Sequence, residues 1–153
     1  MRAFLGLGSN LGNRAFYLSE AVASLRRSTI TVVAVSRIYE TEPWGVQEQP
    51  MYWNQVIEIE TSLAPLELLH VCQEIEQQLG RVRKEHWGSR TIDIDLLIYD
   101  NEVSESPELK LPHPYLEERE FVLAPLREIA PNLILPSGRL INAVLGEGKV
   151  VPL

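Results

Sequence analysis

The sequence contains a single cysteine, Cys72, so the chain cannot form an internal disulfide bond. It also has no Cys-x-x-Cys pair and no cluster of cysteine and histidine that would indicate a structural zinc site. No apolar run approaches the ~18 residues that a membrane-spanning helix needs, and residues 1–12 lack the pattern of a signal peptide. We therefore expect a cytoplasmic protein with no membrane partner that folds without disulfides or structural zinc.

Positive charge is scarce as well. Lys and Arg number 14 against 21 Asp and Glu, which gives a formal net charge of −7 at pH 7. A general nucleic-acid binder needs a basic surface, so this balance argues against nucleic acid as a partner. Residues 81–90 (RVRKEHWGSR) are the exception, because four basic residues there stand against one acidic residue. Such a segment is either a local anion-binding site or a solvated loop.

The chain has the length and composition of one globular domain. Its 153 residues are 45% hydrophobic and 23% charged, which is ordinary for a globular protein, and a chain of this length can bury a sizeable core. We find no internal repeat, low-complexity segment or linker in the sequence. These features predict a single domain over residues 1–153.

Hydrophobic periodicity predicts strands and helices in the order β-α-β-β-α-β. That order is typical of the split βαβ, ferredoxin-like arrangement. It predicts an α+β fold in which a four-stranded antiparallel sheet carries both helices on one face. A proline-rich C-terminal extension with short apolar stretches follows the last strand. The predicted strands are residues 2–8, 30–40, 52–61 and 91–99, and the predicted helices run from a cap at Asn13 to about Arg27 and from Pro65 to a stop at Gly80.

Two aspartates, Asp93 and Asp95, stand at alternate positions of the last predicted strand, TIDIDLLIY. Side chains alternate along a strand that rises ~3.3 Å per residue, so both carboxylates share one face about 7 Å apart. Such an apolar strand is expected to be central and covered, and two like charges there would repel by roughly 2 kcal/mol. A divalent cation would offset this repulsion, and oxygen ligands favour Mg²⁺ or Mn²⁺ over zinc. The residues predicted on the opposite, apolar face are Ile92, Ile94, Leu96 and Ile98.

A plainer interpretation is that the aspartates are polar residues on a solvated face, and an Asp-x-Asp pair alone favours it. However, the basic segment that ends at Arg90 lies directly before this strand. Arginines that bind oxyanions, next to carboxylates that bind a divalent cation, are what a metal–polyphosphate complex requires. The adjacency therefore favours a site for Mg-ATP.

Other motifs are less specific. Residues 6–13 (GLGSNLGN) miss the dinucleotide-binding glycine spacing by one residue and lack the Lys-Ser/Thr of a P-loop, so we interpret them mainly as a tight strand-to-helix turn. Trp44 and Trp87 lie in predicted loops and Trp53 near a strand start. Each tryptophan could close over a flat ligand or, more simply, cap the core.

Single polar residues in the predicted strands and loops leave two interpretations each. Asn54 lies in the middle of a predicted strand, where asparagine is disfavoured, and could pair with a heterocycle or be an exposed polar residue. His113 lies between two prolines and could donate to a phosphate or be exposed. His70 lies off the apolar stripe of its predicted helix and is expected to be exposed, whereas Cys72 lies on that stripe and is expected in the core.

Four sequence blocks together resemble one known family. They are LGLGSNLGNR (5–14), SRIYETEPWGVQEQPMYWN (36–54), EIEQQLGRVRKEHWGSRTIDIDLLIYD (74–100) and LPHPYLEEREFVLAPLREIAP (111–131). The third block is highly specific, and its usual form in the family is R-x-W-G-P-R-T-x-D-x-D. Over about residues 3–138 the chain is similar to the 6-hydroxymethyl-7,8-dihydropterin pyrophosphokinases of folate biosynthesis.

This resemblance implies a ferredoxin-like α+β fold and an ATP-dependent enzyme. The implied reaction transfers pyrophosphate from ATP to the hydroxymethyl group of 6-hydroxymethyl-7,8-dihydropterin, giving AMP and the dihydropterin diphosphate. Two Mg²⁺ ions are implied as cofactors, and ATP and the pterin as small-molecule partners. We expect the protein to act as a monomer.

The resemblance also implies roles for individual residues. The implied catalytic residues are Arg81, Arg90, Asp93 and Asp95, of which the two aspartates bind the Mg²⁺ ions. The implied ATP-binding residues are Glu76, Arg83, Trp87, Arg90, His113 and Arg119. The implied pterin-binding residues are Thr41, Pro43, Trp44, Gly45, Tyr52, Asn54 and Phe121, with Tyr52 and Phe121 as the ring pair that encloses the pterin.

The chain departs from the family pattern at two positions of the basic segment. Ser89 replaces the usual proline, and His86 replaces a usual arginine, which removes a permanent charge near neutral pH. We expect these departures to affect loop closure and ATP affinity rather than the reaction itself.

Two other classes of function remain open on the residues alone. A ligand-sensing ferredoxin-like module would account for the fold but would leave the aspartates beside the arginines without a purpose. A glycosyltransferase with an Asp-x-Asp site would use the same metal chemistry, but 153 residues leave no room for the usual sugar-nucleotide domain. Phosphoryl transfer depends on positioning and charge neutralisation, and the sequence shows no obvious dedicated general base.

Overall fold

The computed structural model describes residues 1–41, 51–80 and 91–153 of the chain. The helices are α1 (Arg14–Arg26), α2 (Pro65–Gln78) and α3 (Glu120–Ile129), with a short 3-10 helix η1 (Ile141–Ala143). None of these helices is long and apolar enough to cross a membrane. The strands are β1 (Arg2–Ser9), β2 (Ile30–Val35), β3 (Tyr39–Thr41), β4 (Tyr52–Thr61), β5 (Asp93–Tyr99), β6 (Ser104–Glu105), β7 (Lys110–Leu111) and β8 (Val150–Pro152).

The described strands form a six-stranded sheet in which β1 lies between β4 and β5, and all pairings are antiparallel. The main path runs β5-β1-β4-β3-β8, and β2 also pairs with β4. β6 and β7 form a separate two-stranded sheet. The predicted α+β class and β-α-β-β-α-β order are confirmed, but the prediction of four strands was wrong.

The predicted strand 30–40 is divided at Ser36. The Ser36 hydroxyl accepts a hydrogen bond from the Val56 N–H at 3.0 Å, and the Ser36 N–H donates to the Val56 carbonyl at 3.0 Å. Because a side-chain oxygen takes the place of a backbone acceptor, the ladder breaks between β2 and β3, which then pair with different parts of β4. The sixth strand is β8, which pairs with β3 and could not be predicted from local patterning.

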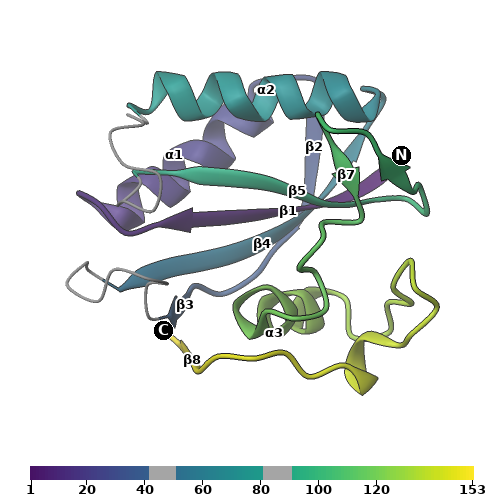
Figure 1. Cartoon of the computed structure of the whole chain (residues 1–153). Coiled ribbons are helices and arrows are strands. Elements are labelled where there is room, and N and C mark those ends of the chain that lie inside the picture. The colour runs from purple at the N-terminus through teal and green to yellow at the C-terminus, as the bar shows by residue number, and fades with distance from the viewer. Residues whose placement is uncertain (42–50, 81–90) are drawn as a thin grey trace.

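The sheet separates two hydrophobic cores. Helices α1 and α2 cover one face, as predicted, whereas α3 and the C-terminal segment cover the other (Figure 1). The first core joins Leu5 and Leu7 of β1 to Leu18 of α1 and Leu68 of α2. The second core joins Phe4, Val56 and Leu97 of the sheet to Leu123 and Leu126 of α3. The C-terminal extension is therefore part of the packed structure.

The ends of α1 and α2 follow the predicted signals. Asn13 is the N-cap of α1, and its Oδ1 accepts a hydrogen bond from the Phe16 N–H at 3.0 Å. Pro65 occupies the first turn of α2, where its missing N–H has no helical partner to lose. Gly80 follows the C-cap residue Leu79 with φ of +85°, a conformation that favours glycine.

Strand β5 lies at the edge of the described sheet, because β1 is its partner there and no described strand flanks its other side. The prediction of a central strand was therefore wrong. The strand is apolar because both of its faces are packed: Ile94 and Leu96 belong to the first core, and Leu97 and Ile98 to the second. A register shift in the pairing with β1 leaves Leu97 unpaired, so Ile98 lies on the face opposite to the predicted one.

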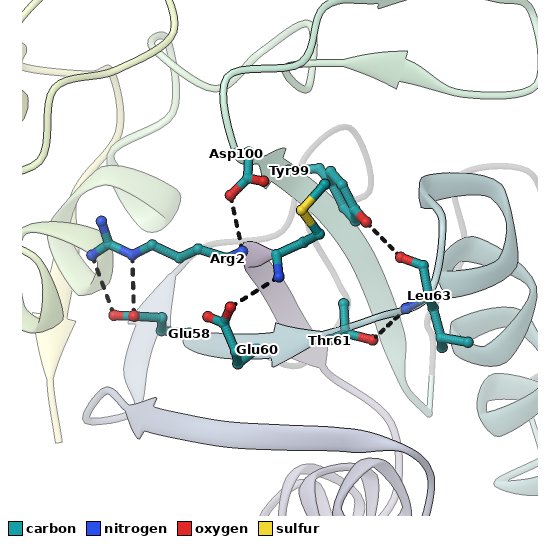
Figure 2. A network of polar contacts seen from close by, with 8 residues as sticks. Arg2, Glu58, Glu60, Thr61, Leu63, Tyr99 and Asp100 are labelled. Carbon is teal, nitrogen blue, oxygen red and sulfur yellow. Dashed lines mark hydrogen bonds and ion pairs between the residues drawn. The ribbon is translucent and has the colours of Figure 1, made fainter.

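A network of polar contacts holds one end of the sheet together (Figure 2). The Arg2 N–H donates to Asp100 Oδ1 at 2.9 Å, and Arg2 Nε donates to Glu58 Oε2 at 3.1 Å. The Tyr99 hydroxyl donates to the Leu63 carbonyl, which ties the end of β5 to the segment before α2. These contacts help to hold the register of β1, β4 and β5 at the end opposite to the one where the candidate site residues lie.

Candidate active site

The pairing of β1 with β4 and with β5 brings the candidate residues of these strands next to one another. Gly8 of β1 pairs with Asp93 of β5 on one side and with Asn54 of β4 on the other. Two residues away, Gly6 pairs with Asp95. Because directly opposite residues of neighbouring strands point to the same face, both aspartates and Asn54 lie on one face of the sheet.

The shared face is the one that packs against α3. Val56 lies two residues from Asn54 on β4, and Leu97 lies two residues from Asp95 on β5. Both Val56 and Leu97 belong to the second core. The candidate site is thus the continuation of that core's sheet face toward the end where β1 stops and β4 and β5 begin (Figure 1).

Gly6 and Gly8 leave the strip of sheet between the aspartates and Asn54 without side chains. A Cβ atom on Gly8 would lie 2.9 Å from Asn54 Oδ1 and 3.8 Å from Tyr52 Cδ1. A Cβ atom on Gly6 would lie 3.4 Å from the Leu97 side chain. Glycine inside a strand often marks a place where a ligand approaches the backbone closely. The glycine strip, as we call Gly6 and Gly8, can therefore lie beneath a flat ligand.

The interpretation of residues 6–13 as a turn holds only for their second half. Gly6 and Gly8 belong to β1, whereas Gly12, with φ of +71°, lies in the turn before α1. The sequence reasoning missed the place of the glycine strip in the site. A signal was available, because glycines two apart in a strand lie on the same face.

Asn54 is buried and its amide is held in place. Its Nδ2 donates a hydrogen bond to Thr41 Oγ1 at 2.6 Å, and the residue is only 8% exposed. The alternative of an ordinary exposed residue is therefore wrong. A fixed amide beside the glycine strip is suited to recognise the polar edge of a heterocycle. Binding of the pterin by Asn54 and Thr41 stays a prediction.

The two aspartates are accessible from the edge of the sheet. Asp95 is exposed and Asp93 is partly exposed. Within the part of the chain that the structure describes, no group of three or more His, Cys, Asp and Glu side chains could hold a metal ion. A Mg²⁺ site with one or two carboxylates is ordinary when substrate phosphates and water supply the other ligands.

Glu76 of α2 supports the strand between the aspartates. It is 7% exposed, and its Oε2 accepts a hydrogen bond from the Ile94 N–H at 2.8 Å. Ile94 stands between Asp93 and Asp95, so this bond holds the backbone from which both carboxylates project. The geometry gives Glu76 a positioning role, and its predicted contact with ATP stays a prediction.

Cys72 lies close to the acidic residues Glu76 and Asp95, but it is not a reactive thiol. It is fully buried in the first core, as predicted. Burial of the thiol has the largest effect on its pKa, and the negative charges of Glu76 and Asp95 add to it. Together they raise the pKa of Cys72 to about 12. The thiol therefore stays protonated at neutral pH and acts as a small core residue. His70 is exposed, also as predicted.

His113 lies beside β5 as a neutral imidazole. Its backbone N–H donates to the Leu97 carbonyl at 2.9 Å, and its Nδ1 accepts from the Tyr115 N–H at 3.2 Å. Two causes lower the pKa of His113 to about 4: burial of the ring, which has the larger effect, and the positive charge of Arg119. Because Nδ1 is an acceptor here, the ring proton lies on Nε2, which can donate a hydrogen bond to an anion.

Arg119 and Phe121 lie at the start of α3. The Arg119 guanidinium carbon lies 4.4 Å from the centre of the Tyr115 ring and 5.5 Å from the centre of the Phe121 ring. Such cation–π contacts help to hold the charge in place. Phe121 is partly buried and packs against the core that contains Val56, so it lies on the same side of the sheet as the glycine strip.

Of the three tryptophans in the sequence, Trp53 is the one that lies within the described residues. Its Nε1 donates to Glu40 Oε2 at 3.0 Å, and the Arg14 guanidinium carbon lies 4.3 Å from the centre of its ring. The side chain packs against the first core, on the α1 side of the sheet. This supports the simpler interpretation that Trp53 caps the core.

Several predicted residues cannot be placed in the site. The following lie outside the described residues: Arg81 and Arg90 (catalytic), Arg83 and Trp87 (ATP), Pro43, Trp44 and Gly45 (pterin), and the two departures His86 and Ser89. Their roles stay predictions that rest on the resemblance.

Comparison with known proteins decides the family. Residues 4–131 match the family model described as 7,8-dihydro-6-hydroxymethylpterin-pyrophosphokinase, or HPPK. The chain belongs to the HPPK family. This confirms the family resemblance, and it confirms the prediction of a pyrophosphokinase over that of a ligand-sensing module or a glycosyltransferase.

Curated relatives agree with this assignment. A protein of Bacillus subtilis named 2-amino-4-hydroxy-6-hydroxymethyldihydropteridine pyrophosphokinase is 50% identical over 132 residues, which cover 86% of this chain and 79% of the relative. A protein of Haemophilus influenzae with the same name is 42% identical over 144 residues, covering 94% of this chain and 90% of the relative.

Solved HPPK-DHPS structures share the fold of this HPPK-family chain. A wild-type Plasmodium falciparum HPPK-DHPS with pteroate superposes with a TM-score of 0.73 at 16% identity. An HPPK-DHPS in complex with substrates superposes with a TM-score of 0.72 at 15% identity. The match covers 93% of this chain but only 41% and 42% of those chains, so this chain spans about two fifths of their length. At such low identity these structures support the fold alone.

Proposed function

We propose that this HPPK-family chain transfers a pyrophosphoryl group from ATP to the hydroxymethyl group of 6-hydroxymethyl-7,8-dihydropterin in folate biosynthesis. The products are AMP and the dihydropterin diphosphate. The observation that carries the proposal is the strand register, which sets two carboxylates on one side of the glycine strip and the fixed amide of Asn54 on the other. A reaction between a metal-bound nucleotide and a flat heterocycle needs two such neighbouring sites.

Asp93 and Asp95 would hold the two Mg²⁺ ions of the complete complex. The donor set fits this ion, because both ligands are carboxylates at the accessible edge of the sheet and the phosphates can supply further oxygens. Bound Mg²⁺ would neutralise phosphate charge and lower the pKa of the attacking hydroxyl. Glu76 would keep the spacing of the aspartates by holding the Ile94 N–H between them.

The pterin would lie on the glycine strip. Asn54, fixed by Thr41, would pair with the polar edge of the ring, and Gly8 would allow the ring to approach the sheet. Tyr52 and Phe121 would pack on the ring and shield it from water. The resemblance adds Pro43, Trp44 and Gly45 on the pterin side.

ATP would be held on the β5 side of the strip. Arg119 and the Nε2 proton of His113 would contact phosphate oxygens, one with a full charge and the other with a neutral donor. The resemblance adds Glu76 as a further nucleotide contact. It also adds the basic segment, in which Arg81, Arg83, Trp87 and Arg90 would take part in binding ATP.

The residues would act mainly by positioning. The hydroxymethyl oxygen of the pterin forms a bond to the β-phosphorus of ATP and gives up its proton to solvent. The bond from that phosphorus to the α–β bridging oxygen breaks, and AMP leaves with the bridging oxygen. Such a transfer needs alignment and charge neutralisation more than covalent participation by the protein. The glycine strip and Asn54 would hold the attacking group, and Arg119 and His113 would hold the phosphates opposite to it.

One assay tests the proposed reaction. The protein is mixed with ATP, Mg²⁺ and 6-hydroxymethyl-7,8-dihydropterin, and nucleotide products are separated and quantified. We expect AMP to form only when the pterin is present, together with one equivalent of pterin diphosphate. Formation of ADP, or of AMP without the pterin, would contradict the proposal.

The chain is proposed to act as a monomer with a single domain in the cytoplasm. One sheet contributes to both hydrophobic cores, which supports a single folding unit over residues 1–153. Light scattering coupled to gel filtration tests the monomer directly, and a mass near the chain's 17.4 kDa is expected.

A further inference from the structure

Residues 144–153, which we call the C-terminal tail, lie beyond residues 4–131 that match the HPPK family model. The tail nevertheless runs past α3 and ends beside β3 (Figure 1), and these two elements carry residues of the two walls of the proposed pterin site. Its strand β8 pairs with β3, the strand that carries Thr41. The preceding part of the tail contacts the start of α3, where Phe121 lies.

The backbone of Glu147 forms hydrogen bonds with the residues on both sides of Arg119. The Glu147 N–H donates to the Glu118 carbonyl at 2.8 Å, and the Glu147 carbonyl accepts from the Glu120 N–H at 3.0 Å. The first N–H groups of a helix have no partner inside it, and Arg119, the N-cap residue of α3, makes no side-chain capping bond. The tail therefore caps α3 and holds the backbone from which Arg119 projects.

Gly146 brings the tail against α3 more closely than any other residue could. A Cβ atom on Gly146 would lie 2.6 Å from the Glu120 nitrogen and 2.8 Å from the Arg119 carbonyl carbon. Both are backbone atoms, which cannot move aside without moving the start of α3. The Gly146 N–H also donates to Glu120 Oε1 at 2.9 Å.

Arg127 joins the tail to the same helix. Its Nη1 and Nη2 donate to the two Glu120 carboxylate oxygens at 2.7 Å each, and Nη2 also donates to the Val144 carbonyl at 3.0 Å. Burial alone would raise the pKa of Glu120, but hydrogen bonds from Arg127 and Gly146 outweigh it and lower that pKa. The Glu120 carboxylate is therefore charged at neutral pH and anchors both partners.

We propose that the C-terminal tail is a positioning element for substrate binding. It links β3, which fixes Asn54 through Thr41, to the start of α3, which carries Arg119 and Phe121. The tail thereby sets the separation between the two walls that enclose the pterin. This inference rests on the proposed function of the site. A purely structural tail would stabilise α3 without any specific effect on substrate binding.

The test compares two glycine variants by their Michaelis constants and melting temperatures. Gly146→Ala pushes the tail against the start of α3. Gly138→Ala is the control, because Gly138 also resists substitution, with φ of +92°, but a Cβ atom there would meet nothing within 4 Å. We expect both variants to melt at lower temperature, and only Gly146→Ala to raise the KM for the pterin, by about tenfold. Its kcat should change much less than its KM.

Three results would contradict the inference or its basis. A wild-type KM in Gly146→Ala overturns the positioning role. An equal rise of KM in both glycine variants shows a purely structural tail and also overturns it. If the wild-type protein makes no AMP from ATP and the pterin, the proposed function itself fails, so the two failures are distinguishable.

A second pair of variants tests the positioning role of the tail if Gly146→Ala does not fold. Arg127→Lys keeps the charge but loses the planar guanidinium that bonds both Glu120 oxygens and the Val144 carbonyl. Arg139→Lys is its control, because the bond from Arg139 to Glu117 lies at the surface and includes no residue of the tail. We expect Arg127→Lys alone to raise the pterin KM, and equal KM values in the two variants would overturn the proposal.

Discussion

Gly8 and Asn54 face each other across the pairing of β1 with β4 so closely that a methyl group on Gly8 would lie 2.9 Å from Asn54 Oδ1. The amide is therefore confined on two sides, by the β1 backbone and by the hydroxyl of Thr41. This confinement fixes the orientation of a buried amide that borders the glycine strip. In the proposed site, it would tie pterin recognition to the absence of a side chain at position 8.

Gly8→Ala should weaken pterin binding more than ATP binding. The added methyl group must displace the Asn54 amide, and a misplacement of about 1 Å in a binding group can reduce activity by up to roughly 100-fold. We expect the KM for the pterin to rise by about tenfold or more, with the KM for ATP nearly unchanged. Steady-state kinetics with each substrate varied in turn measures both values, and an unchanged pterin KM would show that Asn54 does not bind the ring.

Glu76→Leu should weaken both the fold and the response to Mg²⁺. The substitution leaves the buried Ile94 N–H without the acceptor seen at 2.8 Å, which costs about 1–3 kcal/mol in the free energy of unfolding. Because Ile94 stands between the aspartates, we also expect half-maximal activity to need more Mg²⁺. Urea unfolding and a Mg²⁺ titration of activity measure the two effects.

Glu76→Gln is the matched control for that change. Glutamine retains an amide oxygen that can accept from the Ile94 N–H, so the backbone between Asp93 and Asp95 should stay in place. We expect this variant to keep a Mg²⁺ dependence close to the wild type. If Glu76→Gln loses activity as fully as Glu76→Leu, the charge of Glu76 matters in itself and the positioning role is wrong.

Much of the fold could be predicted because its signals are local. The cap at Asn13, the first-turn Pro65 and the stop at Gly80 are short-range features that the structure confirms. The alternation of apolar and polar residues along β4 and β5 predicted the first and last residues of both strands to within two residues. The alternation also placed Asp93 and Asp95 together on one face, as the register with Gly8 and Gly6 confirms.

The remaining features depend on contacts between distant segments. β5 appeared central because it is apolar, but its second face belongs to the core that α3 helps to form, and no local pattern reveals that. The break at Ser36 depends on its bond to Val56, twenty residues away. The glycine strip was missed because glycine suits a turn and a bare strand equally well, and only strand pairing distinguishes them.

His113 gives the free protein a characteristic pH dependence. Its pKa is lowered to about 4 by burial and by Arg119, from 6.5 as the ordinary value. Between about pH 6.5 and pH 4 the unfolded chain therefore binds more protons at this residue than the folded chain. The contribution of His113 to the free energy of unfolding is present above pH 6.5 and is lost as the pH falls through that window.

Proton NMR of the imidazole ring tests this assignment, with His113→Gln used to identify the signal. We expect His113 to titrate near pH 4 in the free protein. Arg119→Gln should raise this pKa, because it removes a neighbouring positive charge, and bound Mg-ATP should raise it if a phosphate oxygen accepts from Nε2. A midpoint at or above 6.5 in the free protein would contradict the burial of the ring.

Replacement of Asp95 tests the central claim most directly. Asp95→Asn removes the negative charge from the exposed carboxylate. Asp100→Asn is the matched control just beyond the other end of β5, where the Asp100 side chain accepts a hydrogen bond from the Arg2 N–H. AMP formation from ATP and 6-hydroxymethyl-7,8-dihydropterin is measured for both variants over a range of Mg²⁺ concentrations. We expect Asp95→Asn to lower kcat by about 100-fold or more while remaining folded, and Asp100→Asn to keep wild-type turnover. Turnover within a few fold of wild type in Asp95→Asn would contradict the account.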